Sequence, residues 1–261
     1  NILDGVDSIY YINMEKSLER KQYIESILEN DYFKDIPKKR INAIDGTDPK
    51  FHIENFLQFH NGAFQNPKML PTEYATTISH IDAIYSFILE AEDKNWNDDA
   101  IALIVEDDLS TEFMPYWRTS IKNMIKTRCP KDWEIVQLSY ILFDFTPVDE
   151  YVEWEMKKNL CGTAAYLIRL SGAKRFIDYL SKYSNTLRFR YYIGGEYPFF
   201  HHADRFIYSF LKTYSVNPPL FTYRDNNDSM IHPDHMNFHA KSKERTKKLW
   251  LGWDAAEGAS L

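Results

Sequence analysis

The chain opens with successive signals for a strand, a helix and a second strand. Residues 7–13 form a mainly apolar run that ends in Asn13, the pattern of a buried strand. Residues 17–30 then place apolar side chains three and four positions apart, which predicts a helix with one buried face and Ser17 as its N-cap. A short strand over 38–46 closes in an Asp-Gly turn, so this order predicts the opening of a doubly wound α/β sheet. The expected buried helical face comprises Leu18, Tyr23, Ile24, Ile27 and Leu28.

A long helix and a central strand follow. Residues 47–72 are polar and weakly periodic, so we expect an excursion beside the sheet. From about Glu73 to Lys94 apolar residues recur at helical spacing, which predicts a long helix. The run 101–105 is continuously apolar, which is typical of a strand covered on both faces. It leads directly into three adjacent carboxylates, residues 106–108.

The second half continues the alternation of helices and strands. We expect a helix over 113–127 and a buried strand over 133–140. Residues 151–160 fit either a helix or a hairpin. The small side chains of 161–170 predict a strand that another element approaches closely, and Ser171 stands as the N-cap of the helix that follows.

The C-terminal part holds an aromatic loop, a helix from about Asp204 and a polar, charged tail. The tail, residues 237–261, could pack as one helix. The sequence contains no internal repeat and no low-complexity linker. We therefore expect one α/β domain over residues 1–236, with the tail packed on it.

Composition narrows the function classes. The 261 residues are 44% hydrophobic, enough for a sizeable core, and the formal net charge of -7 argues against nucleic acid as a partner. Two cysteines, Cys129 and Cys161, make no disulfide framework and no metal cluster. No run of about 18 apolar residues could span a membrane. No signal peptide is visible, and the compartment of this soluble protein stays open between the cytoplasm and, if a signal has been trimmed, a host or secretory lumen.

The three carboxylates of residues 106–108 need an explanation, because like charges so close repel one another. In an open α/β sheet, ligands bind at the carboxyl ends of the strands, where Asn13 and Asp45 also stand. Hard cations such as Mg²⁺ or Mn²⁺ prefer carboxylate oxygens and keep positions open for phosphate. The triplet therefore indicates either a metal-bridged nucleotide or a solvated loop, and composition alone leaves both open.

Several other site classes lack their motifs. The sequence has no G-x-x-x-x-G-K-[ST] phosphate loop and no G-x-G-x-x-G after the first strand. It has no G-x-S-x-G elbow and no H-E-x-x-H pair. These absences argue against a kinase, an ordinary dehydrogenase and a serine hydrolase.

Eight short motifs follow one another from about Ser8 to about Ile231. In order they are YYINMEKSLERK, INAIDG, EYATTISHIDAI, ALIVEDDLS, WEIVQLS, GTAAYLIRLSGAKRFIDYL, ADRFIY and PPLFTY. By their order and spacing the chain resembles glycosyltransferase family 25. That family contains bacterial lipooligosaccharide galactosyltransferases, which act in lipopolysaccharide biosynthesis, and the collagen β-galactosyltransferases.

The resemblance implies a GT-A-like fold, with a mostly parallel central sheet flanked by helices in a single domain. It also implies an inverting, metal-dependent transferase that takes a hexose, galactose first and glucose next, from a UDP-sugar. The acceptor would be a hydroxyl of a glycan or of a protein, collagen-like protein included. The cofactor would be Mn²⁺ or Mg²⁺ at a D-x-D-like motif, with Glu106 and Asp108 as the metal residues.

The resemblance further assigns residues to the nucleotide-sugar donor. They are Ile12, Asn13, Arg20, Asp45, Gly46, Glu73, Ser79, His80 and Asp107. Simpler roles stay open for several of them. Arg20 would also suit a helix-surface ion pair, and Asp45 with its glycine a plain turn. Glu73 would suit a first-turn charge, and His80 a buried core histidine.

An inverting transferase needs a base near the acceptor hydroxyl. By resemblance Asp204, before a late helix, is the first candidate and Glu196 the second, although Asp204 would also suit an N-cap. His232 or His235 could add a third metal ligand. Nearby aromatic side chains could form an acceptor platform or simply pack their loop: Tyr191, Tyr192, Tyr197, Phe199 and Phe200.

One departure from the family keeps other functions open. Where the family often has GEIGC, residues 71–77 of this chain read PTEYATT, without the glycines. An inactive UDP-sugar-binding domain is therefore one alternative. A glycan-binding accessory module without a nucleotide site, suggested by the 16% aromatic content, is another. A nucleotide-sugar hydrolase would share the site but lack an acceptor.

Overall fold

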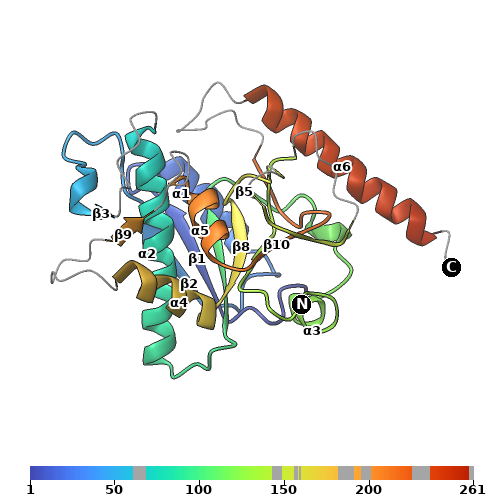
Figure 1. Ribbon diagram of the computed structural model, residues 1–261. Helices are drawn as coiled ribbons and strands as arrows, with labels where there is room; N and C mark the ends of the chain where they lie inside the picture. The colour runs from blue at the N-terminus through green and yellow to red at the C-terminus, as the bar shows by residue number, and fades with distance from the viewer. Residues whose placement is uncertain are drawn as a thin grey trace.

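In the part of the chain that the structure describes, seven strands form the central sheet. The computed structural model describes residues 1–60, 69–142, 149–155, 158, 160–181, 191–194, 201–224 and 236–258. The strands are β1 (Ser8–Asn13), β2 (Lys38–Asn42), β4 (Ile101–Glu106), β6 (Ile135–Gln137), β7 (Tyr151–Glu153), β8 (Ala165–Arg169) and β10 (Thr213–Val216). Their order across the sheet is β2-β1-β4-β8-β6-β10-β7 (Figure 1). Strands β8 and β7 run antiparallel to their neighbours, whereas the other five share one direction.

Helices cover both faces of this sheet. They are α1 (Leu18–Leu28), α2 (Pro71–Asp93), α3 (Ile121–Thr127), α4 (Leu170–Ser181), α5 (Ala203–Phe210) and α6 (Met236–Gly258), with the short 3-10 helices η1 (Ile53–Asn55) and η2 (Met114–Tyr116). Helices α2, α4 and α5 pack on one face, and Figure 1 shows α2 lying along the sheet there. Helices α1 and α3 pack on the other face.

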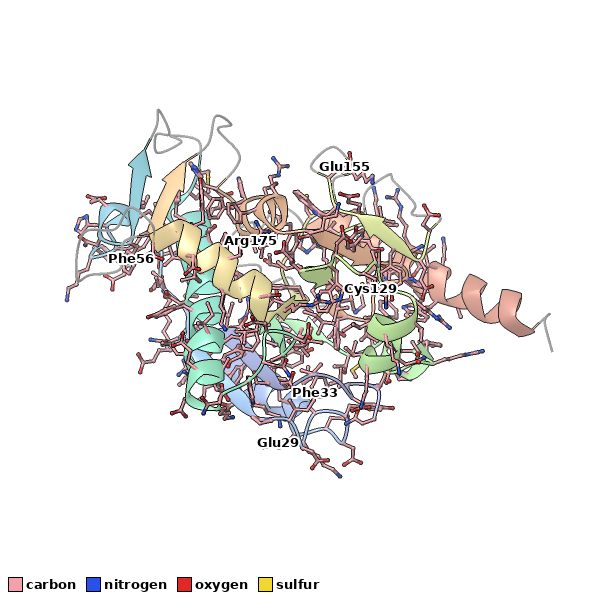
Figure 2. All side chains as sticks on the ribbon, turned by 60° about the horizontal axis from the view of Figure 1, so that its bottom comes forward. Glu29, Phe33, Phe56, Cys129, Glu155 and Arg175 are labelled. Atoms are coloured by element: carbon pink, nitrogen blue, oxygen red, sulfur yellow. The ribbon has the colours of Figure 1, made fainter. Side chains whose placement is uncertain are left out.

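Side chains of the central strands alternate between two core layers, as a sheet covered on both faces requires. In β1, Tyr10 and Ile12 belong to the layer beneath α2, whereas Ile9 and Tyr11 belong to the layer beneath α1. Phe33, labelled in Figure 2, is fully buried in this second layer. The α/β, GT-A-like fold class, with a mostly parallel sheet flanked by helices in one domain, is thus confirmed.

Two small sheets lie outside the central one. Strand β3 (Leu57–His60) pairs in parallel with β9 (Tyr191–Gly194), so the predicted excursion after residue 46 contains a strand. Strand β5 (Leu109–Ser110) pairs antiparallel with β11 (Thr222–Tyr223). The second pair brings the C-terminal part of the chain beside the three carboxylates that follow β4.

Some local predictions were wrong. Leu18 is 65% exposed rather than on the buried face of α1, because it is the first residue of that helix. Helix α4 begins at Leu170, so Ser171 lies inside its first turn and not at the N-cap. The helix expected over 113–127 is divided into η2 and α3, since Ser120 starts α3 anew by accepting the N–H of Asn123 at 3.2 Å. Residues 151–153 form strand β7, which pairs with β10, so the start of that segment is a strand and not a helix.

The C-terminal helix α6 is fastened to the rest of the protein. Ser242 Oγ accepts the N–H of Leu142 at 2.7 Å, and Trp250 Nε1 donates to the carbonyl of Pro219 at 3.0 Å. The helix expected in the tail is therefore confirmed, and the division of the chain at residue 236 stays a prediction. Within the described ranges, no helix combines the length and the apolar character needed to cross a bilayer.

Candidate functional site

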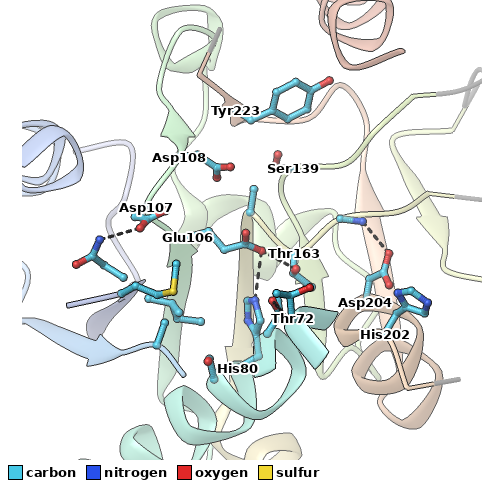
Figure 3. A pocket seen from close by; sticks show the side chains of 18 of the residues that line it. Thr72, His80, Glu106, Asp107, Asp108, Ser139, Thr163, His202, Asp204 and Tyr223 are labelled. Carbon is cyan, nitrogen blue, oxygen red and sulfur yellow. Dashed lines mark hydrogen bonds and ion pairs between the residues drawn. The ribbon is translucent and has the colours of Figure 1, made fainter. Parts of the chain in front are cut away.

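A cleft opens where the carboxyl ends of β1, β2 and β4 meet the amino end of β8. Its volume is about 680 Å³, within the range of ordinary ligand pockets (Figure 3). The predicted site residues that line it are Ile12, Asn13, Arg20, Asp45, Gly46, Ser79, His80, Glu106, Asp107, Asp108 and Asp204. The fold thus gathers at one edge of the sheet residues that lie far apart in the sequence.

Asp107 is held by an ion pair and a hydrogen bond. Its Oδ1 lies 2.7 Å from Nε and 2.5 Å from Nη2 of Arg20, and its Oδ2 accepts a hydrogen bond from Asn13 Nδ2 at 2.7 Å. The residue is only 8% exposed. Burial raises the pKa of Asp107, because the charge of Arg20 and the hydrogen bond from Asn13 offset only part of the lost hydration. Both of its carboxylate oxygens therefore contact other side chains.

Asp108 lies where the chain enters β5. Its Oδ2 is 3.3 Å from Nη2 of Arg20, and its carbonyl oxygen accepts the N–H of Arg224 at 2.8 Å. The guanidinium of Arg224 makes two 3.0 Å hydrogen bonds with Glu19. Glu19 and Arg20 are adjacent on α1. Glu19 holds Arg224, which directly follows β11, and Arg20 holds Asp107 and Asp108 of the carboxylate triplet.

Glu106 ends β4 and is contacted by two side chains through the same oxygen. Thr163 Oγ1 donates to Oε1 at 2.6 Å, and Nε2 of His80 lies 3.2 Å from it (Figure 3). Burial acts to raise the pKa of Glu106, but the hydrogen bond and charge of His80, the hydrogen bond from Thr163 and the charge of Arg20 together lower it. The cleft therefore contains an ionised Glu106 whose orientation is fixed.

The loop after β2 lines the cleft beside β1. Asp45 accepts hydrogen bonds from the backbone N–H and from Oγ1 of Thr47, at 3.0 Å and 2.6 Å, and pairs with Lys16. Partial burial acts to raise the pKa of Asp45, and these contacts outweigh it and lower the pKa. The Asp-Gly pair is thus a turn fixed by its own side chain, and its carboxylate also borders the cleft.

Gly46 and Ser79 join that loop to α2. A Cβ atom on Gly46 would lie 2.5 Å from Cα of Thr72, so only glycine allows the two backbones to approach so closely. Ser79 Oγ accepts the N–H of Ile44 at 3.0 Å and donates to the carbonyl of Ala75 at 2.7 Å. Both residues therefore set the distance between the loop and the helix.

Glu73 is placed at the start of α2. Its Oε2 accepts the N–H of Leu70 at 2.7 Å, and its Oε1 is 3.5 Å from Nδ1 of His202. It is 8% exposed and is not among the residues that line the cleft. These contacts fit a first-turn capping charge, and a donor contact by Glu73 stays a prediction.

Asp204 lies across the cleft from the carboxylate triplet, on the first turn of α5 (Figure 3). His202 occupies the N-cap position, so the alternative role of Asp204 as the N-cap is wrong. Its Oδ2 accepts the N–H of Gly162 at 2.9 Å and its Oδ1 that of Arg205 at 2.7 Å. Beside it, burial raises the pKa of the Cys161 thiol to about 12. Two backbone N–H groups thus fix the orientation of the Asp204 carboxylate.

The family model described as glycosyltransferase family 25 (LPS biosynthesis protein) matches residues 6–191. The chain belongs to glycosyltransferase family 25. The match includes the carboxylate triplet and ends before Asp204. No curated protein is significantly similar to this family 25 glycosyltransferase in sequence.

Fourteen chains of solved structures match the structure of this glycosyltransferase. One is described as the crystal structure of a glycosyltransferase involved in the glycosylation of the major capsid of PBCV-1. It is 10% identical in sequence with a TM-score of 0.38, and the alignment covers 88% of this chain and 98% of that chain. The family assignment rests on the sequence match, and the fold on the sheet described above.

A divalent cation in this glycosyltransferase would meet the carboxylates of Glu106 and Asp108 rather than a closed cage. Among the described residues, no group of three or more His, Cys, Asp or Glu side chains is arranged to hold an ion. Asp107 already contacts Arg20 and Asn13. Oε2 of Glu106 has no hydrogen-bond partner in the described ranges, and the Asp108 side chain is 28% exposed. This donor set fits a cation shared with a diphosphate, since Mg²⁺ is commonly held by one or two carboxylates together with substrate phosphates.

The cleft also contains residues that sequence analysis did not single out. They are Met14, Ala43, Ile44, Thr47, Thr72, Thr76, Ser139, Tyr140, Ile141, Cys161, Gly162, Thr163, Ala164, His202, Arg205, Tyr223 and His239. Ser139 lies near the end of the strand expected over 133–140, and that position was a usable signal. Thr163 precedes β8 and reaches the cleft only because β8 is antiparallel. Tyr223, the last residue of the motif PPLFTY, comes from the C-terminal part of the chain together with His239, and their ring centroids are 4.7 Å apart.

Some predicted positions lie outside the described residues. They are Glu196, Tyr197, Phe199, Phe200, His232 and His235, together with the side chains of Tyr191 and Tyr192. Their roles as a second base, an acceptor platform and a third metal ligand stay predictions.

Proposed function

We propose that this family 25 glycosyltransferase moves a hexose from a UDP-sugar to a hydroxyl of a glycan or protein acceptor. Transfer would invert the anomeric carbon and use a divalent cation, Mn²⁺ or Mg²⁺. The observation that carries the proposal is the meeting of Glu106, Asp108, Asp45 and Asp204 around one cleft at the carboxyl ends of the strands. Galactose is the favoured sugar and glucose the next, on the family resemblance alone.

The carboxylates of the triplet support the binding of a cation, and through it of a diphosphate, on one side of the cleft. Glu106 and Asp108 would hold the cation, which when bound would neutralise the charge that develops on the departing diphosphate. Arg20 contacts two of the three carboxylates and has the planar donor geometry that suits phosphate oxygens. The uridine would then lie toward Asn13 and Asp45, at the ends of β1 and β2.

Asp204 is the proposed base. Inversion requires a base on the side of the sugar that faces away from the leaving group, and Asp204 lies across the cleft from the triplet. Its oxygens are oriented by the N–H groups of Gly162 and Arg205, and Asp204 lines the cleft. Asp204 would take the hydroxyl proton while the oxygen bonds to the anomeric carbon and the bond to the diphosphate breaks. Glu196 remains the second candidate.

A thermal-shift panel tests the donor class. UDP, UDP-galactose, UDP-glucose and GDP-mannose are each added with Mn²⁺ or with EDTA, since a ligand of the native state raises the Tm. We expect shifts with the uridine nucleotides that need Mn²⁺, and the best sugar nominates the donor. No shift with any uridine nucleotide would refute the proposal. A shift without sugar transfer to any acceptor would instead support the inactive donor-binding domain.

A further inference from the structure

A buried series of side chains leads from β8 to Glu106. The hydroxyl of Tyr166 lies 3.2 Å from Nδ1 of His80, and Nε2 of His80 lies 3.2 Å from Oε1 of Glu106. Thr163, just before β8, donates to the same oxygen at 2.6 Å. Tyr166 and His80 are fully buried and Thr163 is 7% exposed. The three residues therefore contact Glu106, directly or through His80, from the protein interior.

The direction of the hydrogen bonds to Glu106 follows from the groups involved. A carboxylate only accepts, so Nε2 of His80 carries the proton that faces Glu106. Nδ1 of His80 pairs with the Tyr166 hydroxyl, which accepts from a charged ring and donates to a neutral one. Oε1 of Glu106 thus receives two hydrogen bonds, whereas Oε2 has no partner within the described ranges.

We propose that Thr163, His80 and Tyr166 are positioning residues that turn Glu106 so that its Oε2 faces the cation of the donor complex. The inference rests on the proposed function, because it assumes that a cation binds with the nucleotide. It gives His80 a role through Glu106 instead of a contact with the donor, since a fully buried ring lies behind that carboxylate. It also gives two residues of the triplet different roles. Asp107 is held by Arg20 and Asn13, whereas Glu106 is oriented toward the cation.

Two matched pairs of variants test this role without relying on turnover. Thr163→Val removes the hydrogen-bond donor at nearly constant shape, whereas Thr163→Ser keeps it. In His80→Asn the side-chain amide lies near the former position of Nδ1, so the hydrogen bond to Glu106 is lost. In His80→Gln the amide can lie near the former position of Nε2 and keep that bond. The measured quantity is the Mn²⁺ dissociation constant at saturating UDP, from the electron paramagnetic resonance signal of free Mn²⁺. Urea unfolding of each variant confirms that it is folded.

We expect Thr163→Val and His80→Asn to weaken Mn²⁺ binding by about tenfold or more, the usual effect of removing a residue that orients a metal ligand. Thr163→Ser and His80→Gln should stay close to the wild type. Tyr166→Phe should also weaken Mn²⁺ binding. The control Tyr10→Phe removes a hydroxyl of β1 that donates to Glu90 of α2, and it should leave Mn²⁺ binding unchanged.

The outcomes separate this inference from the proposed function. A wild-type protein that binds no Mn²⁺ in the presence of UDP would overturn the proposed function, and the positioning role with it. If the wild type binds and Thr163→Val and His80→Asn bind Mn²⁺ equally tightly, the positioning role alone is overturned. It is equally overturned if Thr163→Ser and His80→Gln lose as much affinity as their partners, because the cause would then be packing.

Discussion

Adding one methyl group at Gly46 should destabilise the protein, whereas the same change at Gly252 should stabilise it. At Gly46 the new Cβ would lie 2.5 Å from Cα and 2.6 Å from N of Thr72, and 2.7 Å from the carbonyl oxygen of Pro71. All three are backbone atoms of the first turn of α2, so none can rotate away and the loop or the helix must move. Overpacking of this kind costs about 1–3 kcal/mol, occasionally more, and we expect Gly46→Ala near the upper end.

The displacement should also reach the cleft. The loop is fastened to α2 by the N–H of Ile44, which donates to Ser79 Oγ at 3.0 Å, and Asp45 lies between Ile44 and Gly46. UDP binding should therefore weaken together with stability. The control is Gly252 on α6, where nothing lies within 4 Å of the Cβ position. Alanine in a helix is about 0.5–1 kcal/mol more favourable than glycine, so Gly252→Ala should gain stability.

Urea unfolding of the wild type and both variants gives the comparison, with Tm as a second measure. One kcal/mol shifts Tm by about 2–4 °C in a chain of roughly this size, so the two variants should move it in opposite directions. A Gly46→Ala protein whose free energy of unfolding lies within about 0.5 kcal/mol of the wild type, the range of ordinary surface changes, would refute the close approach of loop and helix.

The remaining predictions concern Asp204, Asp107 and Ser79. Asp204→Asn should still bind UDP in calorimetry but lose about 10²–10⁴-fold in sugar transfer, and normal turnover would remove Asp204 as the base. The raised pKa of Asp107 means that its contribution to stability is present below its ordinary pKa of about 3.9 and is lost as pH rises through the higher folded value. The free energy of unfolding of the wild type minus that of Asp107→Asn should therefore fall as pH rises from about 3.9 toward neutrality, and a rise would contradict this sign. Ser79→Ala leaves the N–H of Ile44 without its partner and should cost about 1–3 kcal/mol in urea unfolding, and an unchanged midpoint would speak against that contact.

Local patterns were sufficient for much of the N-terminal half. The apolar runs of β1 and β4 and the periodic apolar positions of α2 determine those elements without help from distant residues. The carboxylate triplet was placed at the ligand edge because a parallel strand presents its carboxyl end there. By contrast, the break between η2 and α3 depends on capping by Ser120, a local signal that helical periodicity hides.

Strand direction explains what was missed in the site. The apolar pattern of β8 is the same whether the strand is parallel or antiparallel, and its pairing with β4 and β6 decides the direction. That direction brings Gly162 and Thr163 to the cleft, where they contact Asp204 and Glu106. Likewise, Arg224 reaches Glu19 across 205 positions of sequence, and such a contact leaves no local pattern.

The most direct test of the proposed donor site is calorimetry of UDP with the wild type and with Asp108→Asn, each in Mn²⁺ and in EDTA. A cation shared between Glu106, Asp108 and a diphosphate couples the two ligands, so each must raise the affinity for the other by the same factor. The account predicts tighter UDP binding in Mn²⁺ for the wild type and no such gain for Asp108→Asn. Equal UDP affinity in Mn²⁺ and EDTA for the wild type, or a full gain in Asp108→Asn, would contradict it.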